Sequence, residues 1–309
     1  MRAIRFHQYG GAEVLRCEDA PVPQPGPDEL LLKVHAAGVN PADWQFRNGW
    51  YKDFAPRRLP FIPGWDVAGT VQAAGPLAGF APGDPVFAMA DMARDGAYAE
   101  YMVLRADAAA AAPRSIPLWQ AAGVPLAALT AWSALFDHGA LRAGQTVLVH
   151  GGAGGVGQFA VQLAHLAGAR VLATASPANH ELLRQLGADE ALDYQGVALQ
   201  RHAGGVDLVV DTAGGATRER SWDMLRRGGL LAGVAMPPPD AAAAQARGLR
   251  ASVVAVVPNG ARLRQIGALF DAGRLQVQID SEFPLAEAAA AQVRSEGRHA
   301  RGKIILRVG

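Results

Sequence analysis

The chain has 309 residues, half of them hydrophobic and 18% charged, which is typical of a globular protein long enough for two domains. Its 29 Lys and Arg nearly balance its 28 Asp and Glu, so a nucleic acid is not expected as its principal partner. No apolar run reaches the roughly 18 residues of a membrane helix, and the amino terminus has no apolar core of a secretory signal. We therefore expect a cytoplasmic protein.

Cysteine and histidine usage argues against a metal centre. The single cysteine, Cys17, excludes an intrachain disulfide and a cysteine-rich metal cluster. The eight histidines are scattered, and no two stand at metal-ligand spacing. We expect no bound metal.

The first 120 residues predict a mostly β, partly open barrel. Short strand-like runs at 30–34, 67–71 and 98–104 are separated by segments rich in Pro and Gly. From Trp119 the pattern becomes helical, and strands then alternate with helices. Six parallel strands of a doubly wound sheet are predicted at 146–149, 170–174, 190–193, 206–211, 229–234 and 252–257.

The carboxyl-terminal segment predicts a return to the first domain. A helical pattern over 263–270 precedes a last strand at 303–308, which must pair outside the dinucleotide-type sheet. The amino-terminal barrel is the natural place for it. We therefore predict a catalytic domain from 1–121 and 258–309, a dinucleotide-binding domain over 122–257 inserted into it, and a ligand cleft between them.

A glycine-rich turn predicts the cofactor. Gly152, Gly154 and Gly157 form a G-x-G-x-x-G pattern between a buried strand and an amphipathic helix, the context that makes this pattern specific. Gly152 allows the tight turn, Gly154 lets the backbone approach a pyrophosphate, and Gly157 lets helix and strand pack closely. The predicted cofactor contacts at this turn are Gly152, Ala153, Gly154, Gly155 and Val156.

The end of the second strand predicts which dinucleotide binds. Enzymes that prefer NAD usually place Asp or Glu there, but residues 173–180 contain no carboxylate. Thr174, Ser176 and Asn179 are predicted cofactor contacts, and the last two can donate hydrogen bonds to a 2′-phosphate. Ser176 followed by Pro177 is also typical of a helix start. The two roles are compatible. Because no Arg or Lys occupies this turn and neutral donors bind anions more weakly than charged ones, we expect a moderate preference for NADPH, about tenfold to a hundredfold in affinity.

Further cofactor contacts are expected along the carboxyl ends of the later strands. Tyr194 is expected to flank the adenine. Thr212 and Val234 are expected to border the crevice, and Val257 to approach the nicotinamide.

Several stretches in the same order resemble the zinc-independent quinone oxidoreductase branch of the medium-chain dehydrogenase/reductase superfamily, which includes zeta-crystallin-like proteins. They are 37–43, 63–71, 96–101, 126–135, 186–194 and 300–306. The resemblance implies a Rossmann sheet inserted into a GroES-like catalytic domain. It also implies a homodimer joined through the last strand of that sheet, with 252–256 as the candidate edge.

The chain departs from the zinc alcohol dehydrogenases of the same superfamily. They carry a cysteine where this chain has Asn40, a His-Glu pair where it has Trp65 and Asp66, and a four-cysteine lobe that it lacks. Without such ligands no Lewis acid is expected. Members of the quinone reductase branch often place a tyrosine where this chain has Gln45, a position that lines the family's pocket.

The resemblance implies hydride transfer from C4 of NADPH to a quinone or to the β-carbon of an activated alkene such as an enal or enone. Asn40 and Thr130 are carried over as catalytic residues that hydrogen-bond near the nicotinamide ribose or the acceptor oxygen. Each has an alternative, since Asn40 before Pro41 is typical of a turn and Thr130 can bond its own helix backbone.

Other residues near Asn40 are candidates for the substrate pocket or the core. Trp44, Trp50 and Trp65 are predicted to line an aromatic slot beside Gln45, or to pack in the core. Asp43 and Arg47 are expected to form a structural i, i+4 ion pair. A protein that binds NADPH without turnover, as a sensor, structural protein or RNA binder, remains the alternative class, because a fold alone does not establish activity.

Overall fold

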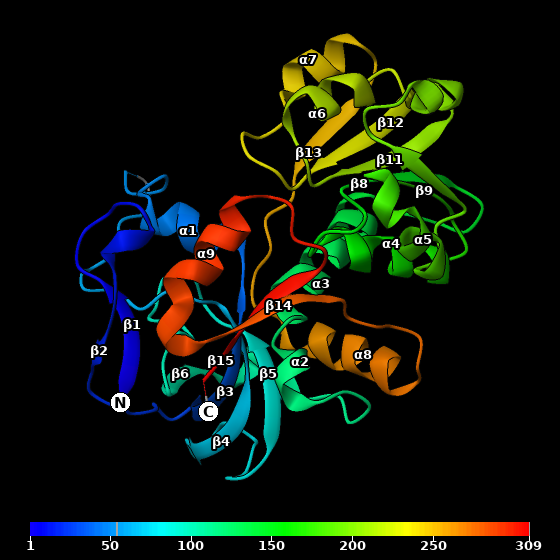
Figure 1. Cartoon of the computed structure of the whole chain (residues 1–309). Coiled ribbons are helices and arrows are strands. Elements are labelled where there is room, and N and C mark those ends of the chain that lie inside the picture. The colour runs from blue at the N-terminus through cyan, green and yellow to red at the C-terminus, as the bar shows by residue number, and fades with distance from the viewer. Residues whose placement is uncertain (54, 309) are drawn as a thin grey trace. The chain divides into compact units, whose positions relative to one another are not determined.

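The computed structural model describes residues 1–53 and 55–308, with only the backbone of residues 197 and 198. Its contacts divide the chain into two compact units (Figure 1). The first unit comprises Met1–Leu126 and Val257–Gly309, and the second comprises Ala127–Val256. Each unit is described by itself.

The first unit is built on a mostly antiparallel sheet with the order β14-β15-β3-β4-β5-β7, in which β6 also pairs with β3. A separate ladder joins β1 to β2. The strands are β1 Arg2–Phe6, β2 Leu15–Asp19, β3 Glu29–Val39, β4 Asp66–Ala74, β5 Pro85–Met89, β6 Tyr101–Arg105, β7 Ala109–Ala111, β14 Ile279–Pro284 and β15 Lys303–Arg307. The predicted mostly β domain is confirmed.

The last strand returns to this sheet as predicted. β15 pairs antiparallel with β3, with Ile304 opposite Val39 and Leu306 opposite Ala37. Buried apolar residues on both strands join one core with the barrel. The helices around it are α1 Pro41–Arg47, α2 Leu118–Ala121, α8 Gly260–Asp271, α9 Ala288–Glu296 and the short 3-10 turns η1 Ala12–Val14, η2 Ala106–Ala108 and η6 Leu285–Glu287.

Helices α1 and α9 are joined by a buried arginine. Arg47 is fully buried, and its guanidinium donates to Gln292 Oε1 at 2.7 Å and forms an ion pair with Glu296. The predicted ion pair between Asp43 and Arg47 is therefore wrong. Asp43 instead turns back toward the start of its own helix, as a capping residue in the third helical position does.

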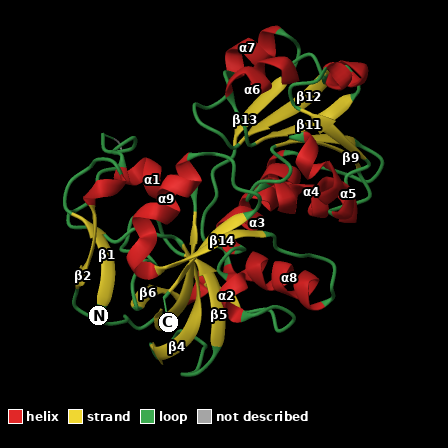
Figure 2. Ribbon diagram, viewed as in Figure 1, coloured by secondary structure: helices red, strands yellow, loops and turns green. Residues whose placement is uncertain are grey.

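The second unit is a six-stranded parallel sheet with the order β10-β9-β8-β11-β12-β13 (Figure 2). This is the doubly wound order that reverses between the first and fourth strands along the chain, here β8 and β11. The strands are β8 Thr146–His150, β9 Arg170–Ala175, β10 Glu190–Asp193, β11 Val206–Asp211, β12 Leu225–Gly233 and β13 Arg250–Val253. The predicted Rossmann sheet is confirmed.

In this sheet, the largest differences from the prediction are the start of β12 and the end of β13. β12 begins at Leu225, four residues before the expected Gly229, and includes the exposed residues 226–228, which gave no apolar signal. β13 ends at Val253, whereas the apolar run was expected to stay a strand up to Val257. The ladder with β12 ends where Gly233 faces Val253, so the later apolar residues have no neighbouring strand.

The helices of the second unit flank this sheet. They are α3 Pro125–Trp132, which begins in the first unit, the π-helical turn η3 Ser133–His138, α4 Gly157–Leu166, η4 Pro177–Asn179, α5 His180–Gln185, η5 Val197–His202, α6 Gly215–Ser221 and α7 Ala241–Ala246. Within residues 1–53 and 55–308, no helix combines the length and the apolarity that crossing a membrane requires.

The first turn of α1 carries a buried carboxyl group. Asp43 is fully buried, and its Oδ2 accepts hydrogen bonds from the Asn40 backbone N–H and the Tyr98 hydroxyl, each at 2.7 Å. Burial raises the pKa of Asp43 from 3.8 to about 7, because these two hydrogen bonds and the nearby Lys303 charge offset only part of the desolvation. The proton of Asp43 is therefore held far more tightly in the folded chain than in the unfolded one.

The stability of the protein should fall with rising pH on account of Asp43. Because its folded pKa lies above its unfolded value, its contribution is complete below about pH 4 and is lost as the pH rises through about 7, with a slope approaching about 1.4 kcal/mol per pH unit. Asp43→Asn keeps an acceptor for Asn40 and Tyr98 but removes the titration. Melting temperatures between pH 5 and pH 8.5 should fall less steeply in this variant.

The matched control is Asp84→Asn, which changes a carboxylate in an exposed turn where it accepts from the Ala81 backbone N–H. This variant should keep the pH slope of the wild type. Identical slopes for Asp43→Asn and the wild type would contradict the assignment.

Candidate active site

The glycine turn after β8 has the shape of a phosphate cradle. Gly151 adopts the left-handed conformation, with φ at 65°, so the tight turn expected at Gly152 is made one residue earlier. A Cβ at Gly157 would lie 2.1 Å from the Gly151 carbonyl oxygen, so helix α4 starts against the turn only because residue 157 is glycine. At Gly154 a Cβ would meet only that same oxygen, at 3.2 Å. The open side at Gly154 fits the close approach of a pyrophosphate.

The turn is supported from below by a buried histidine. His150 Nε2 lies 2.7 Å from Ser221 Oγ, and its Nδ1 lies 3.0 Å from Thr174 Oγ1. Ser221 donates its own proton to the Thr217 carbonyl oxygen, so His150 donates from Nε2 and accepts from Thr174 at Nδ1. Burial lowers the pKa of His150 to about 4, which keeps the imidazole neutral in this role.

Thr174 contacts both His150 and the glycine turn. It is 1% exposed, its hydroxyl faces His150, and its carbonyl oxygen accepts the Gly152 N–H at 2.9 Å. Its contacts therefore hold the glycine turn in place from the neighbouring strand.

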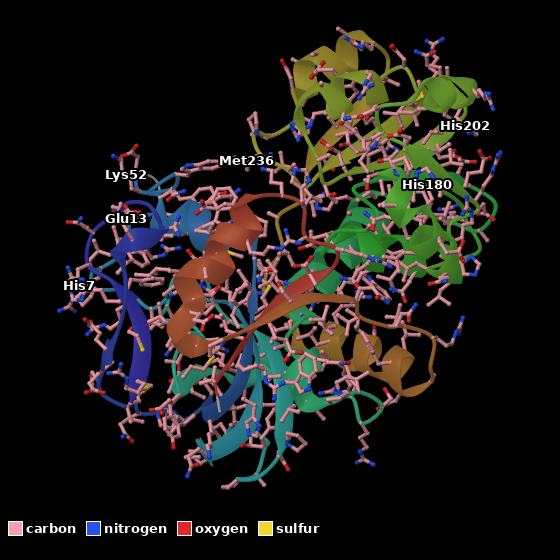
Figure 3. All side chains as sticks on the ribbon, viewed as in Figure 1. His7, Glu13, Lys52, His180, His202 and Met236 are labelled. Carbon is pink, nitrogen blue, oxygen red and sulfur yellow. The ribbon has the colours of Figure 1, made fainter. Side chains whose placement is uncertain are left out.

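The end of β9 presents neutral polar groups. Ser176 lies at the N-cap position of η4 and Pro177 follows as its first residue, as the helix-start alternative predicted. The Ser176 side chain makes no capping hydrogen bond, however, and its Oγ accepts from Asn179 Nδ2 at 3.1 Å. His180, labelled in Figure 3, has its Nε2 3.3 Å from the Ala175 carbonyl oxygen. The position of Ser176 is therefore compatible with both predicted roles, the residue at a helix start and the hydrogen-bond donor to a 2′-phosphate.

The other predicted cofactor residues lie on the carboxyl edge of the sheet, in the glycine turn or, in the case of Val257, in the first unit. Thr212 donates to the His150 carbonyl oxygen at 2.6 Å, and Val234 N–H donates to that of Asp211 at 2.9 Å, so both lie on the carboxyl edge of the sheet. Tyr194 follows β10, and its carbonyl oxygen accepts from Arg220 at 2.9 Å. Val257 lies in the first unit and is 68% exposed. Ala153 is buried, whereas Gly155 and Val156 are partly exposed.

In the first unit, Asn40 belongs to a buried polar cluster with Asp66 and Lys303. The three residues are 2%, 0% and 3% exposed. Asn40 Nδ2 donates to Asp66 Oδ2 at 2.9 Å, and the Lys303 ammonium donates to Asn40 Oδ1 and, at 3.0 Å, to Asp66 Oδ2. Asp66 Oδ1 also accepts the Leu126 N–H at 2.6 Å. The Asn40 amide is thus oriented from both ends.

This donor set does not fit a zinc ion. The positions that are Cys and His-Glu in zinc alcohol dehydrogenases hold Asn40, Trp65 and Asp66 here, and the only carboxylate of the three is already paired with the Lys303 ammonium. A divalent cation would be repelled by that ammonium and would lack soft ligands. Among the residues that the structure describes, no group of three or more His, Cys, Asp or Glu side chains could hold a metal ion.

The predicted pocket residues divide between α1 and the core. The rings of Trp44 and Trp50 meet edge to face with centroids 5.3 Å apart, and Trp50 is half-exposed. Trp65 is fully buried and packs on Phe46 at 5.0 Å, as the core alternative predicted. Gln45 is partly exposed and accepts a hydrogen bond from the Tyr51 hydroxyl at 2.8 Å.

Sequence reasoning assigned no role to Lys303 or His150, and Thr130 stays a prediction. Thr130 is 3% exposed on α3 in the second unit. The predicted pairing of the last strand with the first domain could have indicated Lys303. In an antiparallel ladder with Ile304 opposite Val39, Lys303 comes opposite Asn40. A histidine between a buried strand and a glycine turn carried no comparable signal.

Comparisons with known proteins agree with this arrangement. Residues 26–114 match the alcohol dehydrogenase GroES-like domain, and residues 186–306 match the zinc-binding dehydrogenase family. The chain is 35% identical to a chloroplastic quinone-oxidoreductase of Triphysaria versicolor, over 99% of this chain and 98% of that protein. It is also 35% identical to a chloroplastic NADPH-dependent alkenal/one oxidoreductase of Arabidopsis thaliana, over 99% and 79% of the two chains.

Among solved structures, a mycobacterial protein complexed with NADPH superposes with a TM-score of 0.89 at 34% identity, over the whole of both chains. Full-length similarity at this identity establishes the family. The fold, the glycine turn and these relatives together place the chain in the quinone oxidoreductase branch of the medium-chain dehydrogenase/reductase superfamily.

Proposed function

We propose that the protein is an NADPH-dependent, zinc-independent oxidoreductase that reduces quinones or activated alkenes such as enals and enones. The observation that carries this proposal is the glycine turn on the carboxyl edge of a doubly wound sheet, open at Gly154 and followed at β9 by neutral donors only. The names of relatives support both acceptor classes, quinones and alkenals.

Bound NADPH supplies a hydride at C4 of the nicotinamide. The residues of this chain contribute binding and orientation: the glycine turn holds the pyrophosphate, and Ser176 and Asn179 donate to the 2′-phosphate. Asn40 and Thr130 orient the nicotinamide ribose or the acceptor. Quinones and enones place the new negative charge on an oxygen that water can protonate, so no strong acid is required. Holding two reactants in near-attack geometry contributes roughly 7 to 11 kcal/mol in favourable intramolecular reactions.

Zinc independence follows from the buried cluster. Lys303 already neutralises Asp66, and Asn40 offers only an amide, so we infer that no metal takes part in the reaction.

The central test is consumption of NADPH and of NADH by the purified protein, with one ortho-quinone and one short 2-alkenal, in the presence of a strong chelator. We expect turnover with NADPH that the chelator does not reduce. The better acceptor identifies the pocket as one for flat rings or for alkenes. Tight NADPH binding without turnover on either acceptor would favour the non-catalytic alternative, and loss of activity in chelator would contradict zinc independence.

Cofactor preference is tested by a pair of variants. Ser176→Asp places a carboxylate beside the expected 2′-phosphate and should weaken NADPH binding at least about tenfold while NADH binding changes little. Gly154→Ala puts a methyl group on the open side of the turn and should weaken both dinucleotides by similar factors.

Dissociation constants from NADPH and NADH fluorescence measure both effects. The added carbon of Gly154→Ala would lie 3.2 Å from the Gly151 carbonyl oxygen, so its melting temperature is measured beside that of the wild type to separate a displaced turn from a blocked pyrophosphate. Equal losses of NADPH and NADH binding in Ser176→Asp would contradict the assignment of that turn to the 2′-phosphate.

We also infer a homodimer joined through β13. This strand lies at the end of the six-stranded sheet, and Val253 on it is 49% exposed. The expected edge at 252–256 continues past the end of β13 as an apolar segment, and such an edge is a liability unless another strand or chain covers it. Val253→Lys should therefore shift the mass measured by light scattering from dimer to monomer.

Val293→Lys on α9 is the control, since it changes an equally exposed valine of the first unit and should leave the mass unchanged. A monomeric wild type at micromolar concentration would contradict the inference.

A further inference from the structure

A buried arginine on α6 joins the two loops that follow β11 and β12. Arg218 is 5% exposed and uses all three guanidinium nitrogens. Its Nε donates to Asp211 Oδ2 at 2.5 Å, its Nη2 donates to the Ala235 carbonyl oxygen at 2.5 Å, and its Nη1 donates to the Pro237 carbonyl oxygen. One side chain therefore ties the end of β11 to the segment after β12.

Asp211 completes the connection. Its side chain is fully buried, and Oδ1 accepts the backbone N–H groups of Ala213 at 3.1 Å and Gly214 at 2.8 Å. Its carbonyl oxygen accepts those of Val234 at 2.9 Å and Ala235 at 3.2 Å. The two loops are thus held by both the main chain and the side chain of one residue.

The same turn also reaches the glycine cradle. Thr212 donates to the His150 carbonyl oxygen at 2.6 Å, and a Cβ on Gly151 would lie 2.5 Å from Thr212 Oγ1. A continuous set of contacts therefore runs from the glycine turn through Thr212 and Asp211 to Arg218. It ends at the loop around Met236, which Figure 3 labels and which is 40% exposed.

This loop borders the nicotinamide half of the crevice. In a doubly wound sheet, the first three strands in sequence take the adenosine half of the dinucleotide and the later strands take the other half. Ser176 at the end of β9 belongs to the adenosine half. The ends of β11 and β12 belong to the nicotinamide half, because they lie on the other side of the point where the strand order reverses.

We propose that Arg218 is a positioning residue that fixes the 235–237 loop, and with it the nicotinamide ring, for hydride transfer. This inference rests on the proposed function. An arginine suits the role because its planar fork bonds a carboxylate and two carbonyl oxygens at once, whereas a lysine ammonium is a single point of charge. A purely structural ion pair with Asp211 would need only the charge.

The test is Arg218→Lys, which keeps a charge beside Asp211 but loses the fork. Binding is measured as the Kd of NADPH and the Kd of adenosine 2′,5′-bisphosphate, which probes the adenosine half alone. The hydride step is measured as kcat and the primary isotope effect of C4-deuterated NADPH. We expect a lower melting temperature than the wild type, because the Ala235 and Pro237 carbonyl oxygens lose their donors, but an unchanged Kd for the bisphosphate. We expect kcat to fall about 10- to 100-fold, with a larger isotope effect, because displaced reactants slow the hydride step itself.

Two further variants make the test decisive. Asp211→Asn combined with Arg218→Gln removes both buried charges together and should show the same pattern if the single variant does not fold. Arg226→Lys is the matched control, since Arg226 pairs with Asp207 Oδ1 at 2.5 Å near the opposite, amino edge of the same sheet, and it should leave kcat unchanged.

A kcat within twofold of the wild type in the Arg218 variants would overturn the proposal. Equal losses of affinity for NADPH and for the bisphosphate would overturn it as well, because they would show a general loosening of the unit. A wild type that binds neither ligand would instead count against the proposed function, so the two failures are distinguishable.

Discussion

The second unit depends on the close contact between the start of α4 and the turn that precedes it. With the Gly151 carbonyl oxygen only 2.1 Å from where a Cβ of residue 157 would lie, the helix can begin at this point only on a glycine. The contact brings the helix start to the carboxyl edge of the sheet, where its N–H groups and dipole favour a bound anion. Thr174, His150 and Thr212 then hold the turn from the strands on either side. The predicted cofactor site therefore depends on this packing, and the residues beneath the turn matter as much as the glycines.

A buried ion pair lies in each unit, Lys303 with Asp66 in the first and Arg218 with Asp211 in the second. The two pairs differ in the groups that complete their hydrogen bonds. Burying a charge costs several kcal/mol, which only good geometry and further hydrogen bonds offset. The remaining hydrogen bonds of Arg218 and Asp211 go to backbone groups of two loops, so this ion pair fixes the conformation of those loops. Lys303 and Asp66 are completed by the side chain of Asn40 and the N–H of Leu126. Each pair adjoins a residue that the sequence predicted for the site, Asn40 in the first unit and Thr212 in the second, where a fixed orientation would justify a cost that an apolar core avoids.

The sequence predicted the layers of the fold better than its polar contacts. Buried parallel strands are continuous apolar runs, so all six were found, and the glycine turn was specific because it stood between a strand and a helix. The end of β13 was misplaced because an apolar run does not reveal where its neighbouring strand stops. The Asp43–Arg47 ion pair was wrong because helical spacing shows which side chains share a face, but not that Gln292 and Glu296 lie nearer. Lys303 was missed because Asn40 and Asp66 are distant in sequence. Arg218 was missed because the turn between Asp211 and helix α6 gives no regular spacing that indicates an ion pair.

The charge balance of the cluster in the first unit bears on the chemistry. Lys303 carries one positive charge and Asp66 one negative charge, so this buried pair is neutral as a whole. Such a neutral cluster orients an amide but offers no strong electrophile, unlike a zinc ion, which polarises a carbonyl directly. An enzyme built this way suits acceptors that are already activated, such as quinones and enones, because their negative charge needs little help to reach an oxygen exposed to water. The proposed choice of acceptor therefore follows from the residues at positions 40, 65 and 66, which are Asn, Trp and Asp instead of the metal ligands of zinc alcohol dehydrogenases. A site without a strong electrophile suits an acceptor that is already electrophilic.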